Sequence, residues 1–206
     1  MQNYDIDDNE LLFKETRRYE IREGKIYYMS GALTGHGDAT GNIFNLFKTF
    51  LKGKKCRVFG ENVNVTLKKN FRRLLPDIKI VCDPDKIKKD GIHGAPDLIV
   101  EVISLSTAQI DRGYKFDLYA QNGVKEYWIV DINNKNVEIY LLKDGKFVLD
   151  IIYHDYSDEE IKEVEESTST DEDTLSEKER IKIKTMKTSL FGDDFIINIA
   201  DVFENI

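Results

Sequence analysis

The spacing of hydrophobic and polar residues along the chain alternates between the two-residue period of strands and the 3.6-residue period of helices. Two short runs rich in aromatic and β-branched residues flank the turn at residues 23–25, which predicts a β-hairpin over residues 19–29. A short helix is expected to begin at residues 11–13. After the hairpin, the glycine-rich stretch 30–38 predicts a polar loop, and helical spacing of apolar residues predicts an amphipathic helix over residues 39–52.

The middle of the chain is typical of strands. Imperfect alternation predicts one strand over residues 57–67 with a bulge near Gly60, and a second strand over residues 74–83 entered through Pro76. The charged, glycine-bearing segment 84–96 is expected to be a linker. Residues 97–104 form the most hydrophobic run in the chain, which indicates a strand buried on both faces.

Helix and strand signals follow one another in the second half. Ser106 and Thr107 offer an N-cap for a helix over residues 108–122 that ends at Gly123. Further strands are predicted at residues 125–132, 136–142 and 147–153, with a closing strand and short helix at 195–203. This order predicts a single α+β domain with a mixed sheet over residues 1–206.

Composition indicates a globular intracellular protein. The chain has 206 residues, 41% of them hydrophobic, and only two cysteines, Cys56 and Cys82, which we expect to be reduced. The acidic start of the chain does not resemble a signal peptide, and no apolar run approaches the roughly 18 residues of a membrane span. These features predict a cytoplasmic protein that does not bind membranes.

The net charge of −8 is concentrated in one segment. Residues 157–179 carry eleven Asp or Glu against two Lys, so the other residues hold 27 acidic and 28 basic side chains. We expect an exposed, partly disordered acidic insertion at about residues 157–180. Basic clusters at residues 52–57, 68–73 and 86–89 permit a polyanion partner, although solvated turns are the commoner explanation for such clusters.

Glu101 is a carboxylate within the hydrophobic strand LIVEVI. A buried carboxylate without a partner costs several kcal/mol, so a proton, a basic side chain or a metal must neutralise it. Asp97 shares its face at the strand entrance, and Asp77 begins the preceding strand. If the two strands are neighbours, the carboxylates converge and favour a hard divalent ion.

A simple salt bridge from Glu101 to Lys79 or Lys115 explains the same pattern without any metal. Lys115 could equally pair with Asp111 on its own helix. His36, in the glycine-rich loop, is more often a capping or surface residue than a base. His93 and His154 have no partner at ligand spacing, so zinc is not supported.

Several motifs in succession resemble the Uma-two family of bacterial endonucleases, a branch of the PD-(D/E)XK restriction-endonuclease-like superfamily. The resemblance covers about residues 20–142, with further likeness at Ser189-Leu190-Phe191 and Asp201-Val202-Phe203. The motifs are Met29-Ser30, His36, Leu75-Pro76-Asp77, residues 94–104 (GAPDLIVEVIS), Ser106-Thr107, Asp111, Lys115, Tyr119 and residues 123–131 (GVKEYWIVD). The acidic segment departs from the family pattern.

The resemblance implies a twisted central sheet flanked by helices and a metal-dependent phosphodiesterase site. Asp77 and Glu101 match the two carboxylates, which with the Val102 carbonyl would hold Mg²⁺, or alternatively Mn²⁺. Ile103 stands where the superfamily has its lysine, and Lys115 on the next helix is the candidate replacement. His36 and Asp97 also match family positions and are candidate supporting residues.

Two functions from different classes follow from these observations. The first is a Mg²⁺-dependent endonuclease that cuts nucleic acid, with DNA as the expected substrate. The second is a catalytically silent member that keeps the fold as a binding or assembly module. The sequence leaves open the substrate preference and the oligomeric state, for which a homodimer is one option.

Overall fold

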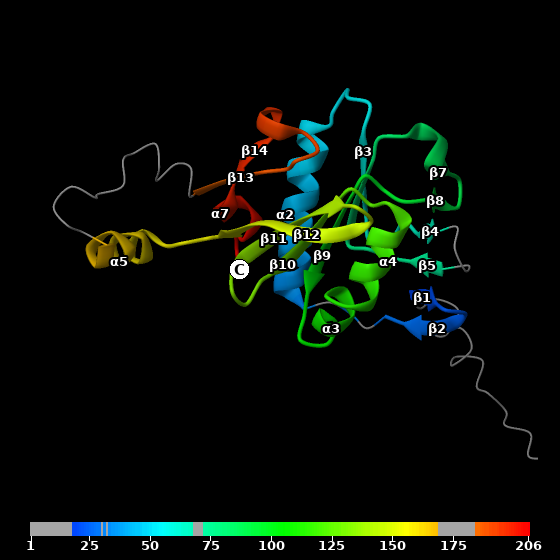
Figure 1. The fold of residues 1–206 in the computed structure, drawn as a ribbon, viewed down its shortest axis with the longest axis horizontal. Coiled ribbons are helices and arrows are strands. Elements are labelled where there is room, and N and C mark those ends of the chain that lie inside the picture. Colours follow the sequence, from blue (N-terminus) through cyan, green and yellow to red (C-terminus); the bar gives the residue numbers. More distant parts are fainter. Residues whose placement is uncertain (1–17, 30, 32, 68–71, 169–183) are drawn as a thin grey trace, which may run out of the picture.

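The structure is a computed structural model that describes residues 18–29, 31, 33–67, 72–168 and 184–206. The predicted helix start at residues 11–13 and part of the basic cluster at 68–73 lie outside this range. Two six-stranded mixed sheets and a two-stranded one form a mixed α+β fold, as predicted (Figure 1).

The larger sheet, called the central sheet, holds the most buried strands. Its spatial order is β12 (Lys146–His154), β11 (Asn136–Lys143), β10 (Glu126–Asp131), β9 (Leu98–Ile103), β6 (Ile78–Val81) and β3 (Arg57–Gly60). The second sheet has the order β2 (Lys25–Tyr28), β1 (Tyr19–Arg22), β5 (Arg72–Leu74), β4 (Val65–Leu67), β8 (Gly91–His93) and β7 (Ile87–Lys88). Strands β13 (Thr185–Lys187) and β14 (Ile196–Asn198) pair with each other.

Helices cover the central sheet on both faces. The helices are α2 (Thr34–Phe50), α3 (Ala108–Asp111), α4 (Tyr114–Asn122), α5 (Asp158–Thr168) and α7 (Ile199–Val202), with 3₁₀ turns at η1 (Pro84–Lys86) and η2 (Gly192–Asp194), and Figure 1 shows α5 apart from the sheet. Leu98, Val100 and Val102 of β9 pack in one core with α2, whereas Ile99 and Ile103 pack in another with α4. Strand alternation therefore turns the Glu101 side chain toward α4.

Most of the predicted elements are confirmed, with shifted ends. The hairpin β1–β2, strand β9, the meander β10–β11–β12 and the closing β14–α7 pair lie where the patterns place them. Gly123, with φ of 88°, ends α4 in the left-handed conformation that glycine adopts easily. The helix predicted over residues 108–122 is instead two helices, α3 and α4, separated at Arg112 and Gly113.

Helix α2 begins at Thr34, so the prediction of a loop over residues 30–38 is wrong for its second part. Glycine lowers helix stability by about 1 kcal/mol per residue, which is why Gly35 and Gly37 suggested a loop. The packing of Ala39, Ile43 and Phe47 of α2 in the core offsets this penalty, so the helix includes both glycines. His36 consequently lies in the first helical turn.

Residues 57–67 do not form one strand with a bulge. Gly60 ends β3 in the central sheet, a turn closed by the Val63 N–H donating to the Gly60 carbonyl follows, and β4 joins the second sheet. The predicted strand over residues 74–83 likewise begins only at Ile78, because Pro76 has no N–H for a ladder. The expected linker over residues 84–96 contains η1 and the β7–β8 hairpin.

Cys56 and Cys82 are joined by a disulfide, so the prediction of two reduced thiols is wrong. Strands β3 and β6 are antiparallel and pair Arg57 with Val81, which brings the two cysteines opposite each other just beyond the ladder. The cysteine count therefore gives no support for a reducing compartment.

The first part of the acidic segment forms helix α5, which its composition did not predict. Ser157 caps this helix, accepting from the Glu160 N–H while the Glu160 carboxylate accepts from the Ser157 N–H. That residues 157–180 are an insertion stays a prediction. Across the described ranges, none of the helices is long and apolar enough to cross a membrane.

Candidate active site

Asp77 and Glu101 lie opposite each other on neighbouring strands. Strands β6 and β9 are antiparallel and pair Ile78 with Val100, so one further step of the register sets Asp77 against Glu101. Both carboxylates are buried. The convergence expected from the sequence thus follows from the strand pairing.

The Asp77 carboxylate is held by the backbone and by His36. Its Oδ2 accepts a 2.8 Å hydrogen bond from the Val102 N–H, and His36 Nε2 lies 3.3 Å from the same oxygen. Hydrogen bonding to Asp77 raises the pKa of His36, although burial opposes this, and hydrogen bonding to the Val102 backbone adds to the rise. The imidazole therefore contacts one of the two carboxylates predicted to bind metal, and this contact favours its protonated form.

The Glu101 carboxylate is bound by Lys115 and Tyr119. Lys115 Nζ and the Tyr119 hydroxyl both donate to Glu101 Oε1, each at 2.9 Å. Burial raises the pKa of Glu101 well above its ordinary value, and the charges of Asp111 and Asp77 raise it further, against the opposing effect of Lys115. The environment therefore makes the Glu101 carboxyl a weaker acid than an exposed glutamate, and its negative charge depends on Lys115.

Lys115 lies among three carboxylates. Besides Glu101, its Nζ is 3.0 Å from Asp111 Oδ1, one helical turn earlier, and 3.5 Å from Glu20 Oε1. These groups raise the pKa of Lys115 even though burial opposes its charge. Both salt-bridge alternatives raised by the sequence, with Glu101 and with Asp111, are therefore present at once.

Glu20 is a member of the cluster that sequence reasoning missed. It is fully buried on β1, where its Oε1 accepts from the Leu75 N–H at 3.0 Å and its Oε2 accepts from Arg22 Nε at 2.8 Å. Burial raises its pKa, but Lys115, Leu75 and Arg22 together lower it below the ordinary value. A polar residue alternating within a hairpin strand gives no sequence signal of this burial.

Lys79 is the second buried lysine of the region. Its Nζ donates to the Pro76 carbonyl at 2.8 Å, which fixes the chain just before Asp77. Burial lowers the pKa of Lys79 to about 7, although Glu101 and Asp77 oppose the shift. The salt bridge from Lys79 to Glu101 that the sequence allowed is replaced by this backbone contact.

Asp97 does not join the cluster. It precedes β9, four residues from Glu101, where its Oδ2 accepts from the Cys82 N–H and its Oδ1 from Lys125 Nζ, both at 2.8 Å. Four residues of strand span about 13 Å, so Asp97 lies at the opposite end of β9. Its contacts tie three chain segments together at that end.

The oxygen atoms of the cluster suit a hard divalent ion. Asp77, Glu101 and the Val102 carbonyl offer carboxylate and carbonyl oxygens, the donors that Mg²⁺ and Mn²⁺ prefer. Within the described residues, no three or more His, Cys, Asp or Glu side chains form a ready-made metal group. An ion here would use two side chains and complete its shell with backbone oxygen and water.

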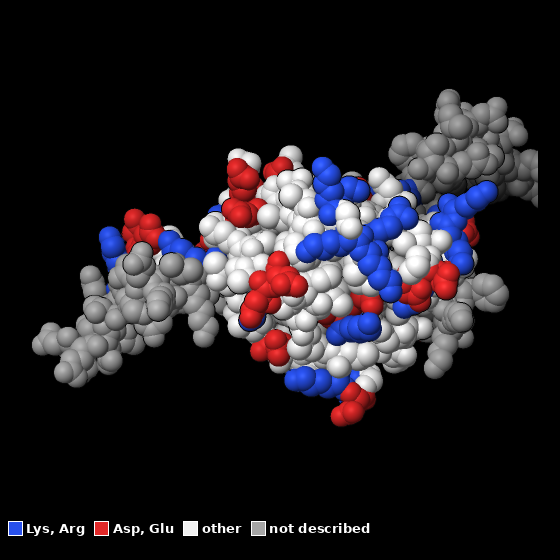
Figure 2. All heavy atoms as spheres, turned by 90° about the horizontal axis from the view of Figure 1, so that it is seen from above, with Lys and Arg blue, Asp and Glu red and all other residues white. Residues whose placement is uncertain are grey.

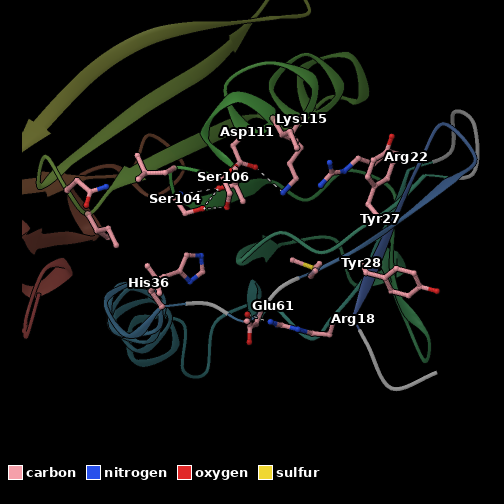
Figure 3. A pocket seen from close by; sticks show the side chains of 18 residues that line it. Arg18, Arg22, Tyr27, Tyr28, His36, Glu61, Ser104, Ser106, Asp111 and Lys115 are labelled. Carbon is pink, nitrogen blue, oxygen red and sulfur yellow. Dashed lines mark hydrogen bonds and ion pairs between the residues drawn. The ribbon is translucent and has the colours of Figure 1, made fainter. Parts of the chain in front are cut away.

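A cavity of about 510 Å³ opens beside the cluster, and Lys115, Asp111 and His36 line it. Figure 3 shows Lys115 and Asp111 on one side of this cavity and His36 on another. The cavity does not expose Asp77 and Glu101 directly, since His36 contacts the first and Lys115 the second. A ligand in the cavity would therefore meet His36 and Lys115 before the two carboxylates.

Basic side chains gather elsewhere on the surface, on the face shown in Figure 2. This face lies at the upper side of Figure 1, near the C-terminal end of α2, where the exposed residues Lys52, Lys54, Lys55 and Arg57 follow the helix. A 17-residue helix is about 25 Å long, so these cations are remote from His36 in its first turn. The cavity itself is lined by Arg18 and Arg22.

The fold and the buried carboxylate–lysine cluster define a nuclease-like α+β protein. The fold is shared with the crystal structure of "a putative nuclease belonging to DUF820" from Anabaena variabilis, with a TM-score of 0.63 and 17% identity over 95% of this chain and 96% of that one. Residues 6–175 match the Uma2 family, described as "Putative restriction endonuclease", and the chain belongs to this family.

Two relatives come from Synechocystis sp. The uncharacterized protein slr1290 is 30% identical over 132 residues, which are 64% of this chain and 70% of the relative. The uncharacterized protein sll1609 is 25% identical over 128 residues, or 61% of this chain and 72% of the relative. The family recognised from the motifs is confirmed by the match of residues 6–175 to the Uma2 family.

We predict that Lys115→Met lowers the free energy of unfolding by about 3–5 kcal/mol, because it leaves several buried carboxylates without their cation. Glu101→Gln should cost clearly less without metal, since Lys115 keeps Asp111 and Glu20. Lys125→Met is the control: this lysine is 67% exposed and should cost about 1 kcal/mol at most. Denaturant melts in EDTA measure all three, and equal losses for Lys115→Met and Glu101→Gln would contradict the charge cluster.

The raised pKa of Glu101 predicts a pH dependence of stability. Folded Glu101 keeps its proton above the ordinary value of 4.5, where the unfolded chain has lost it, so the native state binds more protons. The wild type should therefore lose stability relative to Glu101→Gln as pH rises from about 4.5 toward the folded pKa. Unfolding in EDTA at several pH values tests this, and a pH-independent difference would contradict it.

Proposed function

We propose that the protein is a Mg²⁺-dependent phosphodiester hydrolase that acts as a DNA endonuclease. The observation that carries this proposal is the pair Asp77 and Glu101, whose buried carboxylates lie side by side on neighbouring strands. An excess of buried negative charge is costly unless a cation relieves it. Membership of a family described as endonucleases supports the same reaction class.

Asp77, Glu101 and the Val102 carbonyl would hold the ion. Bound Mg²⁺ polarises a phosphoryl oxygen and makes a coordinated water more acidic. The Val102 N–H, by donating to Asp77 Oδ2, orients that carboxylate and leaves its other oxygen available. Tyr119 orients Glu101 in the same way through Oε1.

Lys115 is the chain's own source of positive charge at the cavity. Its ammonium stays charged because three carboxylates surround it, and it faces the space where a phosphate would lie. There it would stabilise negative charge that develops on the phosphoryl oxygens during hydrolysis. This assigns to Lys115 the role that the lysine at the position of Ile103 would otherwise fill.

His36 covers Asp77 on the cavity side. While its ring lies 3.3 Å from Asp77 Oδ2, the side chain offsets the charge of that carboxylate. His36 also lines the cavity, where it would donate a proton or a hydrogen bond to a bound substrate. His36 is therefore a candidate supporting residue next to the ion.

We expect the wild type to cut DNA with added Mg²⁺ or Mn²⁺ and to be inactive in EDTA. Asp77→Asn and Glu101→Gln should each lower the rate by at least about a hundredfold, since each removes a charged ligand of the ion. Asp97→Asn is the matched control: it is also a buried Asp on the approach to β9, but it lies away from the cluster and should retain the rate. A panel of duplex, single-stranded and branched DNAs gives the measurement.

The alternative is a catalytically silent module, and two hydrogen bonds favour it, because Lys115 and Tyr119 both donate to the Glu101 carboxylate without any metal. The two proposals differ in metal binding. A nuclease should show a thermal shift with Mg²⁺ that Asp77→Asn abolishes. Absence of both cleavage and thermal shift would favour the silent module.

A further inference from the structure

The cavity beside Lys115 has a wall that the proposed hydrolysis does not use. Hairpin β1–β2 forms this wall, and its residues Arg22 and Tyr27 lie across the cavity from Ser104 and Ser106 (Figure 3). At about 510 Å³, the cavity falls within the range of roughly 300–1,000 Å³ that suits a small ligand. Its lining therefore bears on which part of a substrate lies next to the cluster.

Tyr27 is tied directly to the charged cluster. In the hairpin it pairs with Glu20, so the two side chains share a face of adjacent strands. Arg22 joins them: its guanidinium donates to Glu20 and lies 4.8 Å from the centre of the Tyr27 ring. Glu20 in turn contacts Lys115, so three successive contacts link the ring of Tyr27 to this lysine.

Tyr27 is nevertheless open to a ligand. The residue is 43% exposed, although Arg22 lies over the ring. Part of the ring therefore remains accessible from the cavity. An aromatic ring with an adjacent guanidinium is the usual platform for an unpaired base, because every base has a face that stacks on it. Stacking of this kind does not depend on the base sequence of the nucleic acid.

The loop after β9 supplies the opposite wall. Leu105 is 95% exposed there and lines the cavity, although burial would stabilise so large an apolar side chain. Apolar side chains in such positions insert between bases and open a stack. Ser104, Ser106 and Thr107, the residues next to Leu105 in the chain, also line the cavity. Their hydroxyls hydrogen-bond with one another and can bind sugar or phosphate oxygens.

We propose that this cavity binds one unstacked nucleotide of a single-stranded nucleic acid, with its base on Tyr27 and Leu105 against the neighbouring base. The assignment rests on the proposed function, because it places that nucleotide beside the phosphate to be cut. In a duplex the base faces are already stacked and cannot reach Tyr27. The protein should therefore prefer single-stranded or locally unpaired substrates.

The test is binding in EDTA, where no cleavage occurs, measured by the fluorescence anisotropy of a labelled 20-nucleotide DNA strand. The wild type should bind this strand about tenfold or more tightly than the duplex of the same sequence, and Tyr27→Ala should weaken strand binding by about tenfold. Tyr27→Phe keeps the ring and should bind like the wild type. Tyr156→Ala, which removes a tyrosine of similar exposure (40%) outside the cavity, is the control.

Equal affinity for strand and duplex, or strand binding that is unchanged in Tyr27→Ala, would overturn the proposal. A thermal melt of each variant shows whether weaker binding comes from the missing ring or from an unfolded protein. Tyr27→Phe, which keeps the ring, provides the same check independently. An RNA strand of the same base sequence tests whether the cavity prefers single-stranded DNA or single-stranded RNA. Tighter binding of that strand would assign the cavity to RNA and overturn a preference for DNA.

Cleavage with Mg²⁺ on the same substrates separates this inference from the nuclease proposal. Equal cutting of strand and duplex, unaffected by Tyr27→Ala, would overturn the inference and leave the nuclease intact. Strand binding that depends on Tyr27, with no cutting of any substrate, would support the cavity assignment and overturn the nuclease. Preferred cutting of the single strand, reduced in Tyr27→Ala, supports both.

Discussion

The ammonium of Lys115, buried among three carboxylates, is the interaction on which the site depends. It joins Glu101 of the central sheet, Asp111 of the preceding helix and Glu20 of the hairpin, which are separate elements of the fold. Buried charges are tolerated only when they are paired and hydrogen-bonded, and this one lysine satisfies that condition for several groups. Lys115 therefore links the hairpin wall to β9, in addition to the pairing of β1 with β5 and the hydrogen bond from the Leu75 N–H to Glu20.

One lysine does not balance the whole cluster. Burial and neighbouring carboxylates raise the pKa of Glu101, while His36 lies against Asp77 and is favoured in its charged form. Burial is the largest cause at Glu101 and the hydrogen bond to Asp77 is the largest cause at His36, and in both cases the charge of Asp77 adds to the shift. A divalent ion between Asp77 and Glu101 would offset that charge, and this is why the proposed hydrolase and the observed electrostatics agree.

The sequence predicted the parts of the site that lie within one strand or one motif. A glutamate inside LIVEVI had to be buried, and the family motifs indicated Asp77 and Lys115. Glu20 escaped because its burial depends on β1 pairing with β5 in another sheet, a contact between distant segments. The Cys56–Cys82 disulfide and the break at Gly60 escaped for the same reason, since strand partners decide both.

The central claim is that Asp77 and Glu101 hold a divalent cation, and anomalous diffraction from crystals soaked in Mn²⁺ tests it most directly. The account predicts an anomalous peak within coordination distance of both carboxylates and of the Val102 carbonyl, with His36 moved off Asp77. The same soak of Asp77→Asn crystals should show no peak at this place. Wild-type crystals that show no manganese there, with Glu101 still bound to Lys115 and His36 still on Asp77, would contradict the account.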